Sequence, residues 1–386
     1  MIYKPYKDTG KQLSQLGFGC MRLPTTTGNP GDPIDYEKAG ALIDYAYEHG
    51  VNYFDSAYVY HNGDSEHFIG QALAKYPRDT WNLVTKMPIQ EVKTKDDLPR
   101  IFNEQLERAG VDYFDFYLCH GVMDLNYDAF ASEELGCIAF LDSMKKEGKI
   151  RKLGFSSHCS PAKLAAFCDL YDWDIAQIQL NYFDWDYQDA KRQYEILTEH
   201  GIPVVVMEPC RGGRLVTLCD ESLSFLKAAA PDRSPASWCF RWLQGLPNVQ
   251  VVLSGMTEMD QVVDNVATFE TPQPLSDEES VALTKAIDAF RSKFTVPCTG
   301  CRYCSGCPKG LEIPDILSAY NDICLTDNPF MRGSTVKRLR ARGSECDPAE
   351  CVGCGACYSA CPQGIDTPSI MENFLKIIDE IPAIFK

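Results

Sequence analysis

The sequence predicts an α/β protein, namely a (β/α)8 TIM barrel followed by a small, mostly helical domain. Up to Glu270, eight short apolar runs alternate with longer amphipathic segments, and beyond Pro297 the chain becomes rich in cysteine and glycine. Eight strands that alternate with helices over about 270 residues are typical of a parallel barrel. A doubly wound open sheet shows the same alternation and stays an alternative at this point.

The candidate strands are short runs dominated by apolar and aromatic residues. Such runs are typical of parallel strands that are buried on both faces. They comprise residues 16–20, 52–54, 81–85, 114–119, 152–155, 175–180, 203–206 and 249–253.

Amphipathic segments lie between these runs. In one of them, apolar residues recur at three- and four-residue intervals from Leu98 to Ala109, and the pattern stops at Gly110. This spacing predicts a helix with one buried face that ends at the glycine. A last helix of the barrel is expected at residues 259–269.

A linker with two prolines follows at residues 271–275. Ser276 and Glu279 then form a capping-box pattern, which predicts a further helix that runs toward Phe294. The expected divisions of the chain are a barrel at 1–270, a linker and helix at 271–296, and a second domain at 297–386.

Composition excludes several classes of protein. The hydrophobic share of 45% and the charged share of 24% are those of an ordinary globular chain, and there is room for about two domains. No run of about 18 apolar residues exists for a membrane span, and residues 1–7 lack the apolar core of a signal peptide. A formal charge of −17 argues against nucleic acid and anionic membranes as partners. We therefore expect a cytoplasmic protein.

Of the eighteen cysteines, eight crowd into two motifs near the C-terminus. The other ten have no framework spacing, which is typical of a reducing compartment where free cysteine acts as a small hydrophobic residue. We expect a chain that is sensitive to air, such as an anaerobe would contain.

Ionisable residues end three successive candidate strands. Asp55, Lys86 and His120 each follow an apolar run, and Tyr60 lies five residues after Asp55. In a parallel barrel the carboxyl ends of the strands share one face, where active sites are found. Taken alone, Asp55 could cap a helix and Tyr60 could fill space. Three strand ends in a row favour an active site instead.

These residues also carry a resemblance. Residues 52–60, with Lys86 and His120 at suitable distances, resemble the aldo-keto reductase superfamily over most of 1–270. The resemblance implies a (β/α)8 barrel that binds a nicotinamide coenzyme, NADH or NADPH, across its top, with a catalytic tetrad of Asp55, Tyr60, Lys86 and His120. Further passages similar to the family are 154–157, 177–181, 208–213 and 261–265.

The chemistry of these residue types agrees with the resemblance. An ammonium at Lys86 is expected to lower the pKa of Tyr60 from its usual ~10, and Asp55 would pair with that ammonium. His120 would hydrogen-bond a carbonyl as it gains negative charge, so that a hydride and a proton from Tyr60 complete the reduction to an alcohol. Tyr58 is the rival phenol, but its offset from Asp55 fits less well.

The resemblance assigns positions to the coenzyme as well. Ser156 and Gln177 match positions that hold the nicotinamide amide, and Ser157 stands where the family commonly has asparagine. Met207 or Glu208 occupies the region where many relatives stack an aromatic ring. The other coenzyme positions that the resemblance implies are Ser254, Gly255, Gln261 and Asn265.

The segment at the coenzyme's phosphate end departs from the family pattern. Residues 254–261 contain neither lysine nor arginine, although many members use these residues on a 2′-phosphate. Glu258 and Asp260 would repel such a phosphate. The sequence therefore predicts no strong preference for NADPH.

Two cysteine motifs predict iron-sulfur clusters. Residues 351–362 have the C-x2-C-x2-C-x3-C-P spacing of a bacterial-type ferredoxin, and residues 298–308 repeat it with two residues before the last cysteine. Zinc is the alternative, because C-x2-C pairs serve both metals, but two runs of four thiolates that each precede proline favour [4Fe-4S].

The fourth cysteine of each motif ligates the other cluster in two-cluster ferredoxins. This rule predicts two [4Fe-4S] clusters in a ferredoxin-like domain, with Cys307 as the least regular ligand. One cluster would be held by Cys298, Cys301, Cys304 and Cys361, and the other by Cys307, Cys351, Cys354 and Cys357. The whole chain resembles aldo-keto reductase-like proteins that carry a C-terminal ferredoxin extension. Helices are expected between the motifs.

A basic run at residues 337–342 lies between the motifs of this acidic protein. It is either a solvated helix face or a docking site for an acidic electron carrier, such as a ferredoxin.

The leading hypothesis is an oxidoreductase that interconverts a carbonyl and an alcohol and exchanges electrons through its clusters. One alternative is a ferredoxin-coupled reductase that uses no nicotinamide, because a hydride carries two electrons and a cluster carries one. The other is a redox-sensing or binding protein on a barrel that has lost catalysis.

Overall fold

The structure is a computed structural model that describes residues 1–28, 32–292, 295–324, 329–382 and 384. The chain folds into two compact units. The first comprises Met1–Pro209 and Ala236–Leu275, and the second comprises Cys210–Pro235 and Ser276–Lys386. The second unit thus takes in a segment from within the range predicted for the barrel.

The first unit contains a closed barrel of eight parallel strands in the order β10-β3-β4-β5-β6-β7-β8-β9. The pairing of β10 with β3 closes the ring, so the predicted (β/α)8 barrel is confirmed and the open sheet is excluded. Each strand overlaps one of the eight predicted runs. The strands are β3 Leu16–Gly19, β4 Tyr53–Asp55, β5 Asn82–Met87, β6 Phe114–Val122, β7 Ile150–Ser157, β8 Ile175–Gln179, β9 Val204–Met207 and β10 Val249–Ser254.

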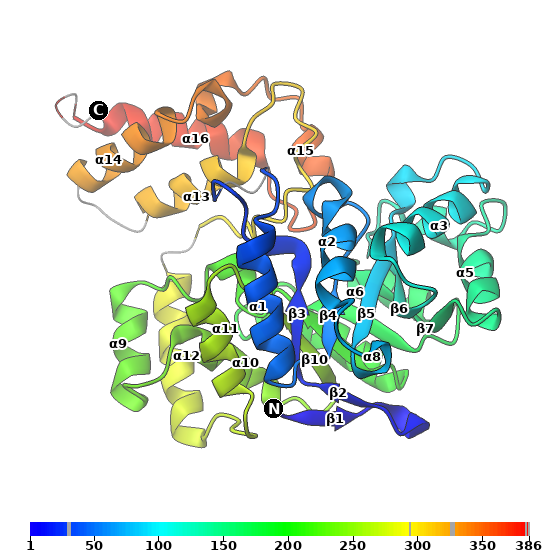
Figure 1. Cartoon of the computed structure of the whole chain (residues 1–386). Coiled ribbons are helices and arrows are strands. Elements are labelled where there is room, and N and C mark those ends of the chain that lie inside the picture. The colour runs from blue at the N-terminus through cyan, green and yellow to red at the C-terminus, as the bar shows by residue number, and fades with distance from the viewer. Residues whose placement is uncertain (29–31, 293–294, 325–328, 383, 385–386) are drawn as a thin grey trace. The chain divides into compact units, whose positions relative to one another are not determined.

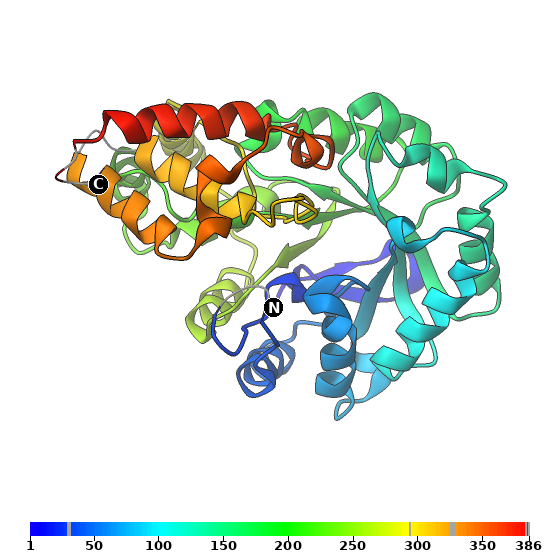
Figure 2. The same ribbon diagram turned by 90° about the horizontal axis from the view of Figure 1, so that it is seen from above.

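Helices surround these strands (Figures 1 and 2). The predicted helix at 98–109 is α3, which ends at Gly110 in the left-handed conformation that glycine favours, with φ 61°. The helix expected at 259–269 is α11. The helices that pack around the barrel include α1 Tyr36–Glu48, α2 Asp64–Leu73, α3 Asp97–Ala109, α4 Tyr127–Ala131, α5 Cys137–Lys146, α6 Pro161–Cys168, α7 Asp184–Tyr187, α8 Ala190–Glu199, α10 Pro235–Gln244 and α11 Met259–Thr268.

A short hairpin, β1 Tyr3–Pro5 and β2 Gln12–Ser14, packs at the amino ends of the strands and was not predicted. Tyr6 lies in its loop and meets Phe116 edge to face, with the ring centroids 5.4 Å apart. The Tyr6 hydroxyl donates a hydrogen bond of 2.7 Å to the carbonyl of Asp174, the residue before β8. The hairpin therefore adds to the core on the side opposite the strand ends predicted to hold the active site.

The second unit is mostly helical. Ser276 and Glu279 form the predicted capping box at the start of α12, with the Ser276 amide 2.9 Å from the Glu279 carboxylate. The predicted end at Phe294 lies outside the described residues. An apolar core joins the later helices, in which Tyr320 meets Phe374 edge to face at 5.5 Å. The helices are α9 Asp220–Ala229, α12 Asp277–Arg291, α13 Ile313–Cys324, α14 Pro329–Arg340, α15 Ala356–Ser359 and α16 Thr367–Glu380.

No helix in the described part of the chain has the length and apolar character needed to cross a membrane.

Candidate functional site

The four predicted catalytic residues lie at the carboxyl ends of neighbouring strands. Asp55 is the last residue of β4, Lys86 belongs to β5 and His120 to β6. Tyr60 starts the 3-10 turn Tyr60–Gly63 that follows β4. Lys86 Nζ lies 2.7 Å from Asp55 Oδ1 and 3.5 Å from the Tyr60 hydroxyl. The Tyr60 and His120 rings meet edge to face, with their centroids 5.8 Å apart. The fold thus brings together four side chains that are distant in sequence.

Asp55 and Lys86 form a buried ion pair, with 2% and 0% of each residue exposed. Burial raises the pKa of Asp55, and the Lys86 ammonium opposes that shift. Lys86 Nζ also donates a hydrogen bond of 2.7 Å to the Ser56 carbonyl. An ammonium has three donors, so these two bonds leave the third for the Tyr60 hydroxyl.

The pKa of Tyr60 is raised well above its usual range, so the predicted lowering by Lys86 is wrong. Burial is the largest cause, and the nearby Asp55, Cys20 and Glu208 add to it. Removal from water and the charge of Asp55 together outweigh the attraction of the ammonium. Tyr60 is therefore a neutral phenol at pH 7, which is the form that donates a proton.

His120 is a buried, neutral imidazole. Burial lowers its pKa well below the usual value, and the charge of Lys86, with that of His158 when it is protonated, lowers the pKa further. Its Nδ1 is buried and has no hydrogen-bond partner among the residues that the structure describes. A neutral ring beside Tyr60 can accept or donate a hydrogen bond without adding a charge to the site.

The rival phenol, Tyr58, points to α3 instead. Its hydroxyl donates a hydrogen bond of 2.8 Å to Glu104, and the Arg108 guanidinium lies 4.2 Å from its ring centroid. Among the two candidates, Tyr60 is the one in contact with Lys86.

Three predicted coenzyme residues lie on β7 and β8. The Ser156 hydroxyl accepts a hydrogen bond of 2.7 Å from the Gly121 amide, and the Ser157 hydroxyl accepts one from a backbone amide two residues later. Gln177 Nε2 lies 3.7 Å from the Met207 sulfur, and Gln177 Oε1 is buried without a hydrogen-bond partner in the described part of the chain. A buried amide oxygen without a partner fits a ligand that offers an N–H, such as a carboxamide.

The end of β9 has an unusual backbone. Met207 closes the strand, and Glu208 follows with φ 53° in the left-handed region, which few residues other than glycine adopt. The Glu208 carbonyl accepts a hydrogen bond of 3.1 Å from the Asn181 side chain. No aromatic ring stands at Met207 or Glu208 to stack on a nicotinamide.

The remaining residues predicted to bind the coenzyme lie at the end of β10 and on α11. Asn265 donates a hydrogen bond of 3.0 Å to the Ser254 hydroxyl. Gln261 binds the backbone at the start of α11, where its side-chain oxygen accepts from the Thr257 amide at 2.9 Å. These two contacts hold the segment around Gly255 in place.

Two cations that the sequence reasoning missed lie next to this segment. A Cβ atom added at Gly255 would meet the Arg22 side chain at 3.3 Å. Lys38 Nζ forms an ion pair of 2.7 Å with the Glu258 carboxylate. This pair offsets the negative charge of one of the two residues expected to repel a phosphate. Arg22 lies three residues after the end of β3. A charged residue just after a predicted strand is the same signal that identified Asp55, Lys86 and His120, so Arg22 could have been predicted in the same way.

Two cavities lie in the second unit, and each is lined by one predicted set of four cysteines. Their walls are otherwise largely apolar, and most of the motif cysteines pack against the core of the unit. In the described residues, no three His, Cys, Asp or Glu side chains come close enough to hold a single metal ion. One cavity is lined by Cys307, Cys351, Cys354 and Cys357, and the other by Cys298, Cys301, Cys304 and Cys361 together with Cys357.

Known proteins resemble this chain over most of its length. It is 25% identical to the NADH-specific methylglyoxal reductase of Escherichia coli, over 74% of this chain and 98% of that protein. It is 30% identical to a probable voltage-gated potassium channel subunit beta of Arabidopsis thaliana, with the same coverage. The structure of an aldo-keto reductase from Bacillus halodurans in its holo form superposes with a TM-score of 0.61, at 27% identity, over 74% of this chain and 96% of that one.

Two family descriptions match the chain. Residues 347–366 match the 4Fe-4S binding domain. Residues 15–288, which include the whole barrel, match the Aldo/keto reductase family. The barrel topology and the sequence motifs both agree with this match. The chain therefore belongs to the aldo/keto reductase family.

Proposed function

We propose that the barrel interconverts a carbonyl compound and an alcohol with NADH or NADPH, and that Asp55, Tyr60, Lys86 and His120 are its catalytic residues. The observation that carries this proposal is the position of the Lys86 ammonium, 2.7 Å from Asp55 and 3.5 Å from the Tyr60 hydroxyl. In this protein family such an arrangement supports an oxidoreductase.

Each side chain has a separate role in the proposed reaction. The bound coenzyme supplies or accepts the hydride. Tyr60 gives its proton to the carbonyl oxygen, and its raised pKa keeps that proton available at neutral pH. His120 hydrogen-bonds the same oxygen while charge develops on it. Lys86 stabilises the phenolate that remains, and Asp55 fixes the position of Lys86.

The coenzyme is proposed to lie along the ends of β7, β8, β9 and β10. Gln177 Oε1 is buried and free to accept from the carboxamide, and Ser156 lies on the neighbouring strand. At the phosphate end, Arg22 is the cation beside Gly255. The absence of cations on residues 254–261 and the NADH specificity of the E. coli relative favour NADH.

The second unit is proposed to hold two [4Fe-4S] clusters, one in each cavity, which exchange electrons with a ferredoxin or another electron carrier in the cytoplasm. Four thiolates around a largely apolar cavity fit such a cluster, and one motif matches the 4Fe-4S binding domain. The acidic surface makes nucleic acid and anionic membranes poor partners.

The test is coenzyme oxidation by the holo protein, purified without oxygen. The protein should oxidise NADH or NADPH in the presence of a panel of aldehydes and ketones. Tyr60→Phe should lower kcat by about 10²- to 10⁴-fold, because the proton donor is lost. Tyr113→Phe, at the amino end of β6, is the matched control. An unaffected Tyr60→Phe variant would refute the assignment.

Two other functions have observations in their favour. Ser156 and Ser157 already bind the backbone, which favours a reductase that takes electrons from ferredoxin and not from nicotinamide. The relative named as a channel subunit favours a binding or sensing role. Titration with NADH and NADPH, followed by tryptophan fluorescence, tests whether the protein binds nicotinamide. The main proposal predicts binding, whereas a ferredoxin-coupled reductase would reduce its substrate without binding either coenzyme.

A further inference from the structure

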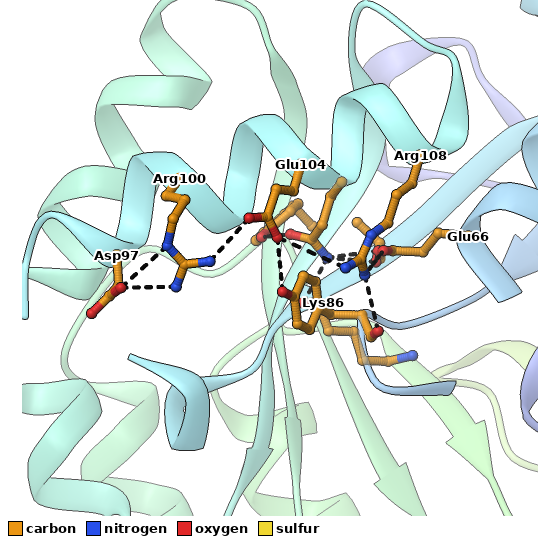
Figure 3. A network of polar contacts seen from close by, with 10 residues as sticks. Glu66, Lys86, Asp97, Arg100, Glu104 and Arg108 are labelled. Atoms are coloured by element: carbon orange, nitrogen blue, oxygen red, sulfur yellow. Dashed lines mark hydrogen bonds and ion pairs between the residues drawn. The ribbon is translucent and has the colours of Figure 1, made fainter. Parts of the chain in front are cut away.

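A buried carboxylate that has no part in the proposed reaction lies behind the candidate catalytic residues. Glu66, in the first turn of α2, is 1% exposed. Its Oε1 accepts hydrogen bonds from the Thr85 hydroxyl and from Gln105 Nε2, the latter at 2.7 Å. Its Oε2 lies 3.5 Å from Arg108 Nη1. Figure 3 shows the Glu66 carboxylate directed at Arg108. Because burying a carboxylate costs several kcal/mol, stability alone is a weak reason for its presence.

The network of Glu66 reaches the strands that carry Lys86 and His120. Gln105 Nε2 also donates a hydrogen bond of 3.0 Å to the Lys86 carbonyl. Gln105 Oε1 accepts a hydrogen bond from the hydroxyl of Tyr117, which lies three residues before His120 on β6. One side-chain amide thus joins the backbone of Lys86 to the strand of His120.

The same network reaches the loop that carries Tyr60. Arg108 Nη1 donates a hydrogen bond of 3.4 Å to the Tyr58 carbonyl, two residues before Tyr60. The Tyr58 hydroxyl donates to Glu104 on α3, beside Arg108 (Figure 3).

The backbone after Tyr60 is strained. His61, Asn62 and Gly63 have φ values of 50°, 56° and 92°, so three successive residues adopt left-handed conformations. Two of them are not glycine, and such residues persist in this region only where the surrounding structure holds them. Contacts on both sides of the turn are therefore needed to hold Tyr60 in place.

We infer that Glu66 is a positioning residue that, through Gln105 and Arg108, holds the Tyr60 loop and the strand ends of Lys86 and His120 at fixed spacing. This inference rests on the proposed function of those residues. A carboxylate suits the role because its Oε1 accepts from Thr85 and Gln105 while its negative charge attracts the Arg108 guanidinium 3.5 Å from Oε2. An apolar residue would fill the space but would remove this acceptor from Gln105 and this anion from Arg108.

The competing explanation is that Glu66 only stabilises the first turn of α2 through the helix dipole. That role predicts a lower melting temperature with unchanged turnover by the folded protein. Positioning predicts a loss of turnover with little change in coenzyme KM, since the coenzyme residues lie on other elements.

The experiment compares Glu66→Gln and Gln105→Leu with Glu107→Gln, an exposed carboxylate on α3 next to Arg108. At a temperature where all variants are folded, the first two should lower kcat about 10- to 100-fold, because displacements of about 1 Å cost that much. Their coenzyme KM should stay within about twofold, and Glu107→Gln should match the wild type. Unchanged kcat in both network variants would overturn the inference.

Hydrogen exchange provides a readout that does not depend on activity. Glu66→Gln should speed amide exchange in peptides covering residues 56–63 and 83–87, and Glu107→Gln should not. If the wild type reduces no carbonyl compound, the proposed function fails, whereas this measurement still tests positioning. Unchanged exchange in both peptides would refute the role of Glu66.

Discussion

At the scale of single residues, the burial of charged groups sets the chemistry of the barrel mouth. Asp55 and Lys86 are almost fully buried, and Tyr60 carries a raised pKa beside them. The spacing of Asp55, Tyr60, Lys86 and His120 was readable from the chain, because each follows a predicted strand. The direction in which the Tyr60 pKa shifts could not be read from the chain, because it depends on how much water the fold removes from the phenol.

The Asp55–Lys86 pair should show strong coupling. Lys86→Met leaves the Asp55 carboxylate buried without its cation, so it should lower the free energy of unfolding by about 3–5 kcal/mol. In the double variant Asp55→Asn with Lys86→Met, the loss should be smaller than the sum of the two single losses. Urea unfolding followed by circular dichroism measures all four proteins. Additive losses would contradict a direct interaction.

Acid should destabilise the protein through His158. Burial lowers the pKa of this histidine to about 4, below the usual value of about 6.5. Between these values the unfolded state binds a proton and the folded state does not, so His158 contributes stability above pH 6.5 that is lost as the pH falls toward 4. From pH 7 to pH 5, the wild type should lose up to about 2 kcal/mol relative to His158→Gln. Equal losses in denaturant titrations at both pH values would contradict this.

At the scale of elements, close packing of α2 on α3 fixes where Glu66 and the turn before it lie. A Cβ atom at Gly70 would come within 2.1 Å of the Ala109 carbonyl oxygen. Only glycine therefore permits this helix spacing. The patterns of α2 and α3 were visible in the sequence, but their contact was not, because it depends on which faces the barrel brings together.

Gly70→Ala should force the two helices apart. We expect a loss of about 1–3 kcal/mol in the free energy of unfolding, the usual effect of overpacking. Gly40→Ala, in α1, is the matched control, because no described atom outside the adjoining helix backbone lies within 4 Å of the added Cβ. That variant should be as stable as the wild type or up to about 1 kcal/mol more stable. Thermal unfolding of both variants checks the contrast, and equal effects would refute the packing argument.

At the scale of the whole molecule, the chain combines a barrel of the aldo/keto reductase family with a helical unit that contains the cysteine cavities. One cavity is lined by three cysteines of the second motif and by Cys307 of the first, and the other by three cysteines of the first motif with Cys357 and Cys361 of the second. Each cavity therefore joins two cysteine motifs that lie more than forty residues apart in sequence. Loss of Cys307 should therefore affect one cavity and spare the other.

Cys307→Ser tests this point. If each cavity holds one [4Fe-4S] cluster, iron should fall from about eight to about four atoms per chain. The control is Cys324→Ser, a cysteine outside both motifs. Anaerobic iron analysis with electron paramagnetic resonance measures the result. Unchanged iron in Cys307→Ser would remove this residue from the set of ligands.

The eight strands, the residues at their carboxyl ends and the two sets of motif cysteines could be predicted from the amino-acid order, because periodicity, strand-end position and ligand spacing are local properties of the chain. Four other features became visible in the folded protein: the hairpin around Tyr6, the cation Arg22 beside Gly255, the pKa of Tyr60 and the Glu66 network. Each of these depends on which distant segments meet and on how far they exclude water, and no local pattern records that.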